Sequence, residues 1–245
     1  MLFMTFSLLY SIMFFAFLTS VWSAPTPNPG HYILQGNHGT LSINTDASKQ
    51  MTFEIETVGA NGHQCALSGT LQGTEGITQK LEGDKEACRV WFVQTGPHRI
   101  DVKSQNDTCW GFCGARATFD GTYQIPPKAC SQASIKKRRK EFLDTYQSKD
   151  YPGAEAILTP LLEGCGDFID WIEEDEIRNE IALTQLHQGK PQACLATLSK
   201  TMASGAAGEE ELTLPPLDRE TYLATAKKIW FNKRLCEKAL VNQKK

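Results

Sequence analysis

The chain has 245 residues, a formal net charge of -3 and eight cysteines. The near-neutral charge argues against a dedicated nucleic-acid surface. The even number of cysteines allows up to four disulfides, and the absence of any C-x-x-C spacing argues against a zinc site built on Cys65, Cys88, Cys109 and Cys113.

The N-terminal stretch is typical of a secretory signal peptide. Residues 1–23 carry no charged side chain and an almost unbroken apolar run, and Val21 and Ser23 favour cleavage after Ser23. The run is close to the roughly 20 residues that span a bilayer, so an uncleaved anchor is the alternative. We therefore expect a periplasmic or secreted protein with no membrane contact beyond the export signal.

The segment after the signal is expected to be a β domain. Residues 24–30 are rich in proline and predict an extended linker that does not pack. In residues 31–127, short alternating runs such as Phe53 and Ile55 against Glu54 and Glu56 are separated by turn residues. Expected strands cover residues 31–35, 40–44, 51–58, 63–71, 77–81, 88–94, 99–103 and 115–124. This pattern predicts an antiparallel barrel or sandwich whose interior is filled by side chains.

Residues 128–245 follow the helical period. Helices are expected at residues 133–147, 151–162, 170–187, 191–198 and 218–241, with Asp170 as an N-cap. Two units repeat at an offset of 40 residues, so that Ala154 and Leu158 match Cys194 and Leu198. These residues resemble tetratricopeptide repeats. The expected fold class is therefore α+β, a barrel or sandwich followed by an all-helical tetratricopeptide-like domain.

The cysteine positions suit two separately cross-linked domains. Four cysteines precede residue 114 and four follow residue 129, and an oxidising compartment favours disulfides among them. We expect the pairs Cys65 with Cys88, Cys109 with Cys113, Cys165 with Cys194, and Cys130 with Cys236.

The candidate binding residues lie in the segment that closes the β domain, CWGFCGARATFDGTY at residues 109–123. Its alternation of Ala117, Phe119 and Tyr123 predicts a returning strand. Trp110 and Phe112 occupy a short loop between two cysteines, with Arg116 close behind. Either both aromatic side chains belong to the core, or the loop projects them as anchors for a protein partner.

No local motif predicts catalysis. The chain lacks a nucleophile elbow, a P-loop and a dinucleotide fingerprint, and no two histidines have the i, i+4 spacing of a helical metal site. We therefore predict no catalytic residue, no metal and no cofactor. A hydrolase of envelope components using dispersed residues is the alternative, with the candidates His63, Asp107, Arg116 and Asp120. A structural assembly factor, with a large apolar patch on the helices, is a third hypothesis.

The segment from Gly39 to Tyr123 resembles an exported bacterial, disulfide-linked β domain. The resemblance rests on NGHxCxLxG at residues 61–69, CRV at 88–90 and CxxxCGARAxFxGxY at 109–123. Such domains are similar to periplasmic lysozyme inhibitors, which implies a protein partner such as a lysozyme-like enzyme. The serine-glycine loop and following tyrosine of the membrane-bound inhibitors have no counterpart here. We expect a non-enzymatic protein-binding module that inhibits or scaffolds envelope enzymes.

Overall fold

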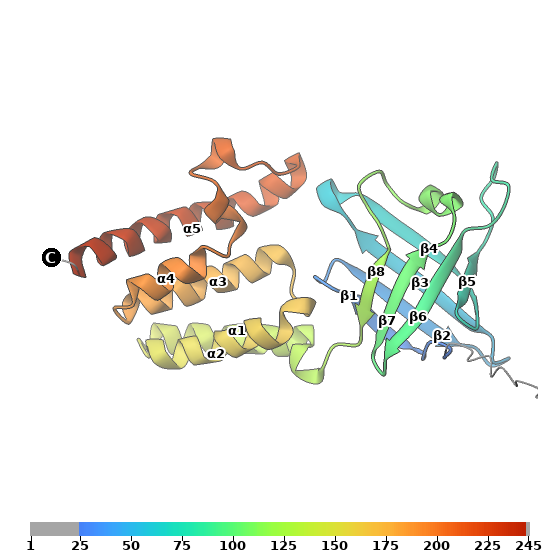
Figure 1. Ribbon diagram of the computed structural model, residues 1–245. Coiled ribbons are helices and arrows are strands. Elements are labelled where there is room, and N and C mark those ends of the chain that lie inside the picture. The colour runs from blue at the N-terminus through green and yellow to red at the C-terminus, as the bar shows by residue number, and fades with distance from the viewer. Residues whose placement is uncertain (1–24, 244–245) are drawn as a thin grey trace, which may run out of the picture.

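The computed structural model describes residues 25–243, and the expected signal peptide lies outside the described residues. An antiparallel β-barrel is followed by a stack of helices (Figure 1). The strands are β1 (Gly30–Leu34), β2 (Gly39–Thr45), β3 (Met51–Val58), β4 (Gln64–Gln72), β5 (Glu75–Thr78), β6 (Arg89–Gly96), β7 (Arg99–Ser104) and β8 (Gly121–Gln124). Each strand pairs with its sequence neighbour, and β8 closes the barrel on β1. The α+β prediction is confirmed, with a barrel rather than a sandwich.

Strand periodicity places the barrel core as the sequence predicts. Phe53 and Ile55 of β3 are buried, whereas Glu54 and Glu56, which alternate with them, are exposed to solvent. Residues of the neighbouring strands and of the loops at the barrel end complete one apolar cluster, in which Phe53 packs on Phe92 with ring centroids 5.0 Å apart. The alternation therefore fills the barrel interior with side chains and leaves the polar face outside.

Three local expectations about the barrel are wrong. The fifth strand covers Glu75–Thr78 and not residues 77–81. The last strand starts at Gly121 and not at residue 115, because residues 115–120 cross the end of the barrel. There Ala117 and Phe119 are buried in the core, and the Thr118 carbonyl accepts a hydrogen bond from Thr57 Oγ1 at 2.8 Å. Residues 115–120 therefore cover the end of the core, and their side chains alternate between buried and exposed as those of a strand would.

The Pro-rich segment also packs, contrary to expectation. Pro27 is buried, and the Asn28 carbonyl accepts from the hydroxyl of the buried Tyr32 at 2.8 Å. The Asn28 N–H donates to Gln94 Oε1 at 3.1 Å. A buried tyrosine hydroxyl needs a hydrogen-bond partner, and this segment supplies it.

The helices begin after Gln124 and pack in sequence order. They are α1 (Gln132–Gln147), α2 (Tyr151–Cys165), α3 (Trp171–His187), α4 (Pro191–Leu198) and α5 (Pro216–Gln243). Asp170 caps α3 through a 2.8 Å bond from the Ile172 N–H, as predicted, and Asp150 caps α2 through the Gly153 N–H. Gly189, at φ 72°, ends the α3 segment. None of the helices in residues 25–243 is both long and apolar enough to cross a bilayer.

The barrel and the helices meet at one end of the barrel. Asp167 accepts from the side-chain amide of Gln35 at 2.9 Å, and its carbonyl accepts from the Gly36 N–H at 2.8 Å. On the other side, Asn61 Oδ1 accepts from the Leu217 N–H at 3.0 Å, and the Asn61 N–H donates to the Asp218 carboxylate. Asn61 therefore caps the start of α5 from a barrel loop, which explains why α5 begins beside the barrel in Figure 1.

All eight cysteines form disulfides, but each of the four expected pairings is wrong. The bonds are Cys65–Cys113, Cys88–Cys109, Cys130–Cys165 and Cys194–Cys236. Cys109 and Cys113 do not pair with each other, because Cys109 is bonded to Cys88 next to β6 and Cys113 is bonded to Cys65 of β4. Cys130 meets Cys165 because the start of one helix lies beside the end of its antiparallel neighbour. Each half of the chain holds two of the bonds, and four disulfides point to an oxidising, exported environment.

Candidate binding site at the cross-linked end of the barrel

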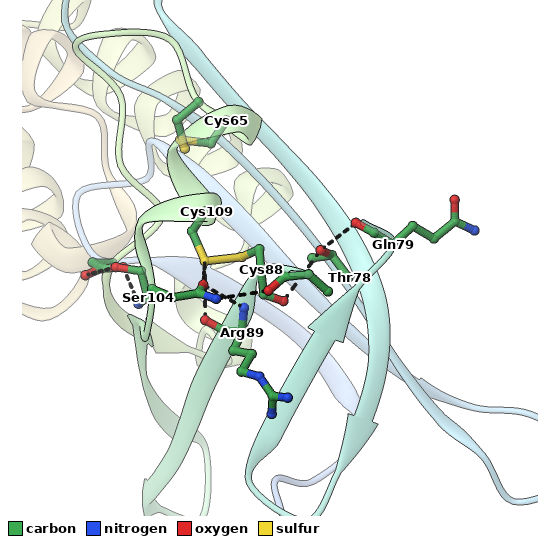
Figure 2. Close-up of a disulfide and its surroundings, with 11 residues drawn as sticks. Cys65, Thr78, Gln79, Cys88, Arg89, Ser104 and Cys109 are labelled. Atoms are coloured by element: carbon green, nitrogen blue, oxygen red, sulfur yellow. Dashed lines mark hydrogen bonds between the residues drawn. A yellow bond between two sulfur atoms is a disulfide. The ribbon is translucent and has the colours of Figure 1, made fainter. Parts of the chain in front are cut away.

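A short 3-10 turn, η2 (Asp107–Phe112), stands at the end of the barrel and is fixed on both sides. Cys109 is bonded to Cys88, which immediately precedes β6 (Figure 2). Cys113 is bonded to Cys65 of β4 and forms an isolated antiparallel bridge with it. The turn between these two anchor points therefore has little freedom to rearrange.

The turn presents Trp110 to solvent. The Trp110 side chain is 63 % exposed, the largest exposed fraction among the large apolar residues of the described chain. Phe112, two residues later, is half-buried against the barrel core. The structure thus separates the two candidate anchors: Trp110 projects, and Phe112 packs. Arg116 is exposed, and its carbonyl lies so close to Gly59 that a Cβ there would approach it to 2.1 Å.

Asn106 ties the turn to β6 through its side chain. Its Oδ1 accepts from the Arg89 N–H at 3.1 Å, and its Nδ2 donates to the Ala87 carbonyl at 3.0 Å. The same Oδ1 lies 3.3 Å from the sulfur of Cys109. One amide thereby satisfies a backbone donor and a backbone acceptor on either side of the disulfide-bonded Cys88.

Replacing Asn106 by alanine is expected to lower the free energy of barrel unfolding by about 1–2 kcal/mol, because two backbone groups lose their partners. Gln105→Ala is the matched control, since Gln105 is exposed and only its backbone N–H bonds to β6. Thermal unfolding of both variants measures the difference. Equal midpoints for the two variants would contradict this role of Asn106.

A groove of about 820 Å³ lies beside the turn, on the outer face of β3 and β4. Glu54, Glu56 and Ser68 contribute to its floor, and Leu81 and Phe112 border it. Gly111 of the turn approaches Leu81 so closely that a Cβ there would meet its side chain at 2.7 Å. The turn that carries Trp110 therefore also forms one wall of this groove.

Two titratable groups near the turn, Arg89 and Tyr123, have their polar atoms paired within the barrel. Arg89 donates to Glu75 at 2.7 Å across β5 and β6, and this hydrogen bond and the carboxylate charge raise the pKa of Arg89. Burial, with a smaller contribution from the charge of Asp120, raises the pKa of Tyr123, whose hydroxyl donates to the Phe119 carbonyl at 2.9 Å.

The four candidate residues of the alternative hydrolase hypothesis do not interact with one another. They are His63, Asp107, Arg116 and Asp120. Asp120 accepts from the backbone and hydroxyl of Ser104, and the ring of His63 packs on Gly114. Asp107 and Arg116 are exposed. Within residues 25–243, no hydrogen bond or ion pair connects any two of the four, and no group of three His, Cys, Asp or Glu side chains is placed to hold a metal ion.

The basic run at residues 136–140 is divided by its partners. Arg139 is paired with Glu173, Glu176 and Glu180 of α3. Lys137 and Lys140 each face an acidic residue one turn later in α1. The run therefore does not form a single cationic stripe.

Comparisons with known proteins do not identify a function for this site, so its geometry is the basis for the proposal below. No protein-family model, no curated protein and no solved structure matches this chain.

The groove is the part of this end that sequence reasoning missed. Outward-facing Glu54 and Glu56 were predictable from the alternation of β3. That they line one groove with Phe112 was not predictable, because the groove depends on where β5 stops pairing with β4, which no local sequence signal specifies.

Proposed function

We propose that this chain is an exported, non-enzymatic protein-binding module that uses the Trp110 turn as its contact surface. The observation that carries the proposal is a tryptophan 63 % exposed on a turn held by two disulfides. Tryptophan is enriched among residues that dominate binding energy, and a pre-ordered loop loses little entropy on association. An exposed aromatic side chain fixed in this way supports a role in recognition more than one in stability.

The partner class to test first is a lysozyme-like enzyme, because the β domain resembles those of periplasmic lysozyme inhibitors. The proposed locations are the periplasm or the extracellular space, in keeping with the oxidising environment indicated by four disulfides. In this setting the barrel would inhibit or scaffold an envelope enzyme. The helices would provide a second surface for the same assembly.

The test compares Trp110→Ala with Trp91→Ala in the oxidised chain of residues 24–245. Trp91 is 51 % exposed on β6 and is therefore a matched control for loss of an exposed indole. Calorimetric titration with lysozymes of several structural types, and inhibition assays on the same samples, should show at least about a tenfold weakening for Trp110→Ala only. Equal weakening of partner binding by both variants would mean that the contact surface is not specific to the Trp110 turn. Absence of any Trp110-dependent partner, among lysozymes or in an envelope extract, would overturn the proposal.

We also propose that the helices form tetratricopeptide-like pairs. The supporting observation is that Ala154 in α2 and Cys194 in α4, at matching positions of the 40-residue repeat, are both completely buried. Small residues at these positions allow the paired helices to approach closely. An experimental structure in which α1 and α2 do not superpose on α3 and α4 would contradict this assignment.

A further inference from the structure

The backbone ladder on one edge of β4 contains a gap. Odd-numbered residues of β4 bond to β3, so even-numbered residues direct their N–H and C=O groups to the other edge. On that edge Gln64 accepts from the Gly114 N–H at 2.8 Å, and pairing with β5 reaches only as far as Gly69. Between these points, no backbone hydrogen bond joins Ala66 or Ser68 to a neighbour on that edge within residues 25–243, although Cys113 lies opposite Cys65 and Thr78 lies opposite Gly69.

The gap exists because β5 turns away from β4 at Thr78. The Thr78 N–H donates to the Cys88 carbonyl at 3.1 Å, and its hydroxyl donates to the Gln79 carbonyl (Figure 2). Beyond Thr78 the chain no longer pairs with β4, and Gln79, Lys80 and Leu81 line the groove. The groove of about 820 Å³ opens where the two strands separate.

Unpaired backbone groups and carboxylates share this groove. Ser68 lies opposite Glu54 and Ala66 lies opposite Glu56 in the β3–β4 register, and all four residues are exposed on the outer face. Neighbouring strands are about 4.8 Å apart, so a chain docked on the edge of β4 lies about 10 Å from the backbone of β3. Because the side chains of Ala66 and Ser68 are short, a long basic side chain can cross the outer face of β4 and reach Glu54 and Glu56.

We propose that the groove receives a cationic loop of the protein partner. Its backbone would bond to the open edge at Ala66 and Ser68, and its arginine or lysine would reach across β4 to Glu54 and Glu56. A loop is favoured over a full added strand because Gly114 closes one end of the gap and β5 closes the other. Two carboxylates against the single Lys80 give the lining a net negative charge, and the ring of Phe112 is a further favourable neighbour for a cation.

The first measurement tests the open edge without any ligand. The Ala66 and Ser68 amides are expected to exchange with solvent faster than the Leu67 amide between them, because only Leu67 faces β3. Amide exchange followed by NMR on the complete oxidised chain resolves the three sites. Protection of all three to the same extent would show that the edge is closed and would overturn the proposal.

The second measurement uses the peptide acetyl-Gly-Arg-Gly-amide as the probe, with acetyl-Gly-Gln-Gly-amide as its neutral match. The arginine peptide should give saturable shifts at the Ala66 and Ser68 amides. The Glu54→Gln, Glu56→Gln variant should weaken its binding at least about fivefold. A Glu210→Gln, Glu237→Gln variant changes net charge equally at exposed helical positions and should leave the binding unchanged.

Equal binding of the two peptides, or no saturable shift at these amides, would overturn the cationic-loop proposal. The proposal rests on the protein-binding function, but the two fail differently. Trp110-dependent partner binding with an unresponsive groove would leave the proposed function intact. A responsive groove with no Trp110-dependent partner would place recognition in the groove alone.

Discussion

Removal of the Cys65–Cys113 bond by alanine substitution is expected to destabilise the barrel by about 4 kcal/mol. The bond closes a segment of 48 residues, and the loss of loop entropy in the unfolded chain has about this size for such a segment. Cys65 is only 1 % exposed, so alanine avoids burying a free thiol or hydroxyl. Hydrogen exchange of core amides such as Phe53 and Ile55 should accelerate by roughly a thousandfold.

Two internal comparisons make this measurement specific. Removing Cys88–Cys109, which closes a segment of 21 residues, should cost about 3.3 kcal/mol by the same entropy relation. Amides of α3 such as Ile181 should keep their protection in both variants, because the helices carry their own two disulfides. Acceleration of the helical amides to the same extent would mean that the barrel and the helices unfold as one unit.

The sequence predicts those parts of the fold that local periodicity determines. In β3, alternation places Phe53 inward and Glu54 outward, and the structure agrees. The same rule misassigned residues 115–120, because a plug across the barrel end alternates as a strand does. Periodicity reports which side chains are buried and does not report whether the backbone has a neighbouring strand.

The disulfide pairs lie beyond local inference because they join segments that only the assembled fold brings together. Cys65 reaches Cys113 only after β4 and η2 meet at the barrel end, and Cys130 reaches Cys165 only after α1 packs on α2. Eight cysteines allow 105 pairings. Proximity in sequence is a poor guide among them, as Cys109 and Cys113 show.

The candidate site was predictable only in part, because its final arrangement also depends on segments that the assembled fold brings together. A tryptophan between two cysteines suggested either a core residue or a projecting one, and the structure shows a projecting Trp110. Phe112, which has the same local context, packs on the core and borders the groove. The difference arises because the turn advances by about a third of a rotation per residue, so neighbours two apart face different surroundings.

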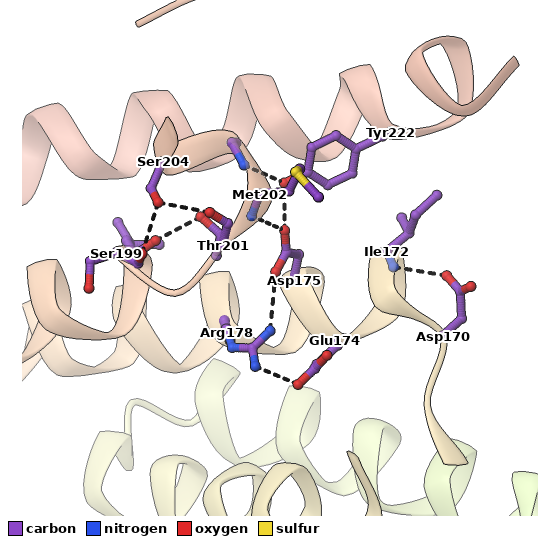
Figure 3. Close-up of polar contacts among 12 residues, drawn as sticks. Asp170, Ile172, Glu174, Asp175, Arg178, Ser199, Thr201, Met202, Ser204 and Tyr222 are labelled. Carbon is purple, nitrogen blue, oxygen red and sulfur yellow. Dashed lines mark hydrogen bonds and ion pairs between the residues drawn. The ribbon is translucent and has the colours of Figure 1, made fainter. Parts of the chain in front are cut away.

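A second large effect is expected at Asp175, a buried carboxylate that joins three elements of the helical stack (Figure 3). It is 3 % exposed. It accepts from the Tyr222 hydroxyl at 2.6 Å, from the Met202 N–H at 2.8 Å and from Arg178 at 3.2 Å. Asp175 therefore links the loop after α4 to α3 and α5, and Tyr222 and Trp230 of α5 bond to Ala203 of the same loop.

Asp175→Ala should lower the free energy of unfolding of the helices by about 3–5 kcal/mol, because one buried donor and two partly buried donors lose their acceptor and Arg178 loses one of its two paired carboxylates. Tyr222→Phe removes one of these donors and should cost only about 1 kcal/mol. Exchange of the α3 and α5 amides measures both effects, with barrel amides as the reference. Similar losses of unfolding free energy in the two variants would mean that the bond from Tyr222 accounts for the whole effect and that the other contacts of the carboxylate contribute little.

Asp175→Asn separates the charge of this group from its hydrogen bonds. Burial raises the pKa of Asp175 in the folded chain, although its hydrogen bonds and Arg178 act in the opposite direction. A carboxyl with a raised folded pKa contributes most below its unfolded pKa of about 3.9 and loses that contribution as pH rises through the folded pKa. Asparagine does not titrate, so the stability advantage of the parent chain over Asp175→Asn should shrink from pH 4 to pH 7.5. An advantage that grew over this range would mean that Arg178 and the hydrogen bonds outweigh burial, and that the folded carboxylate is stabilised as an anion.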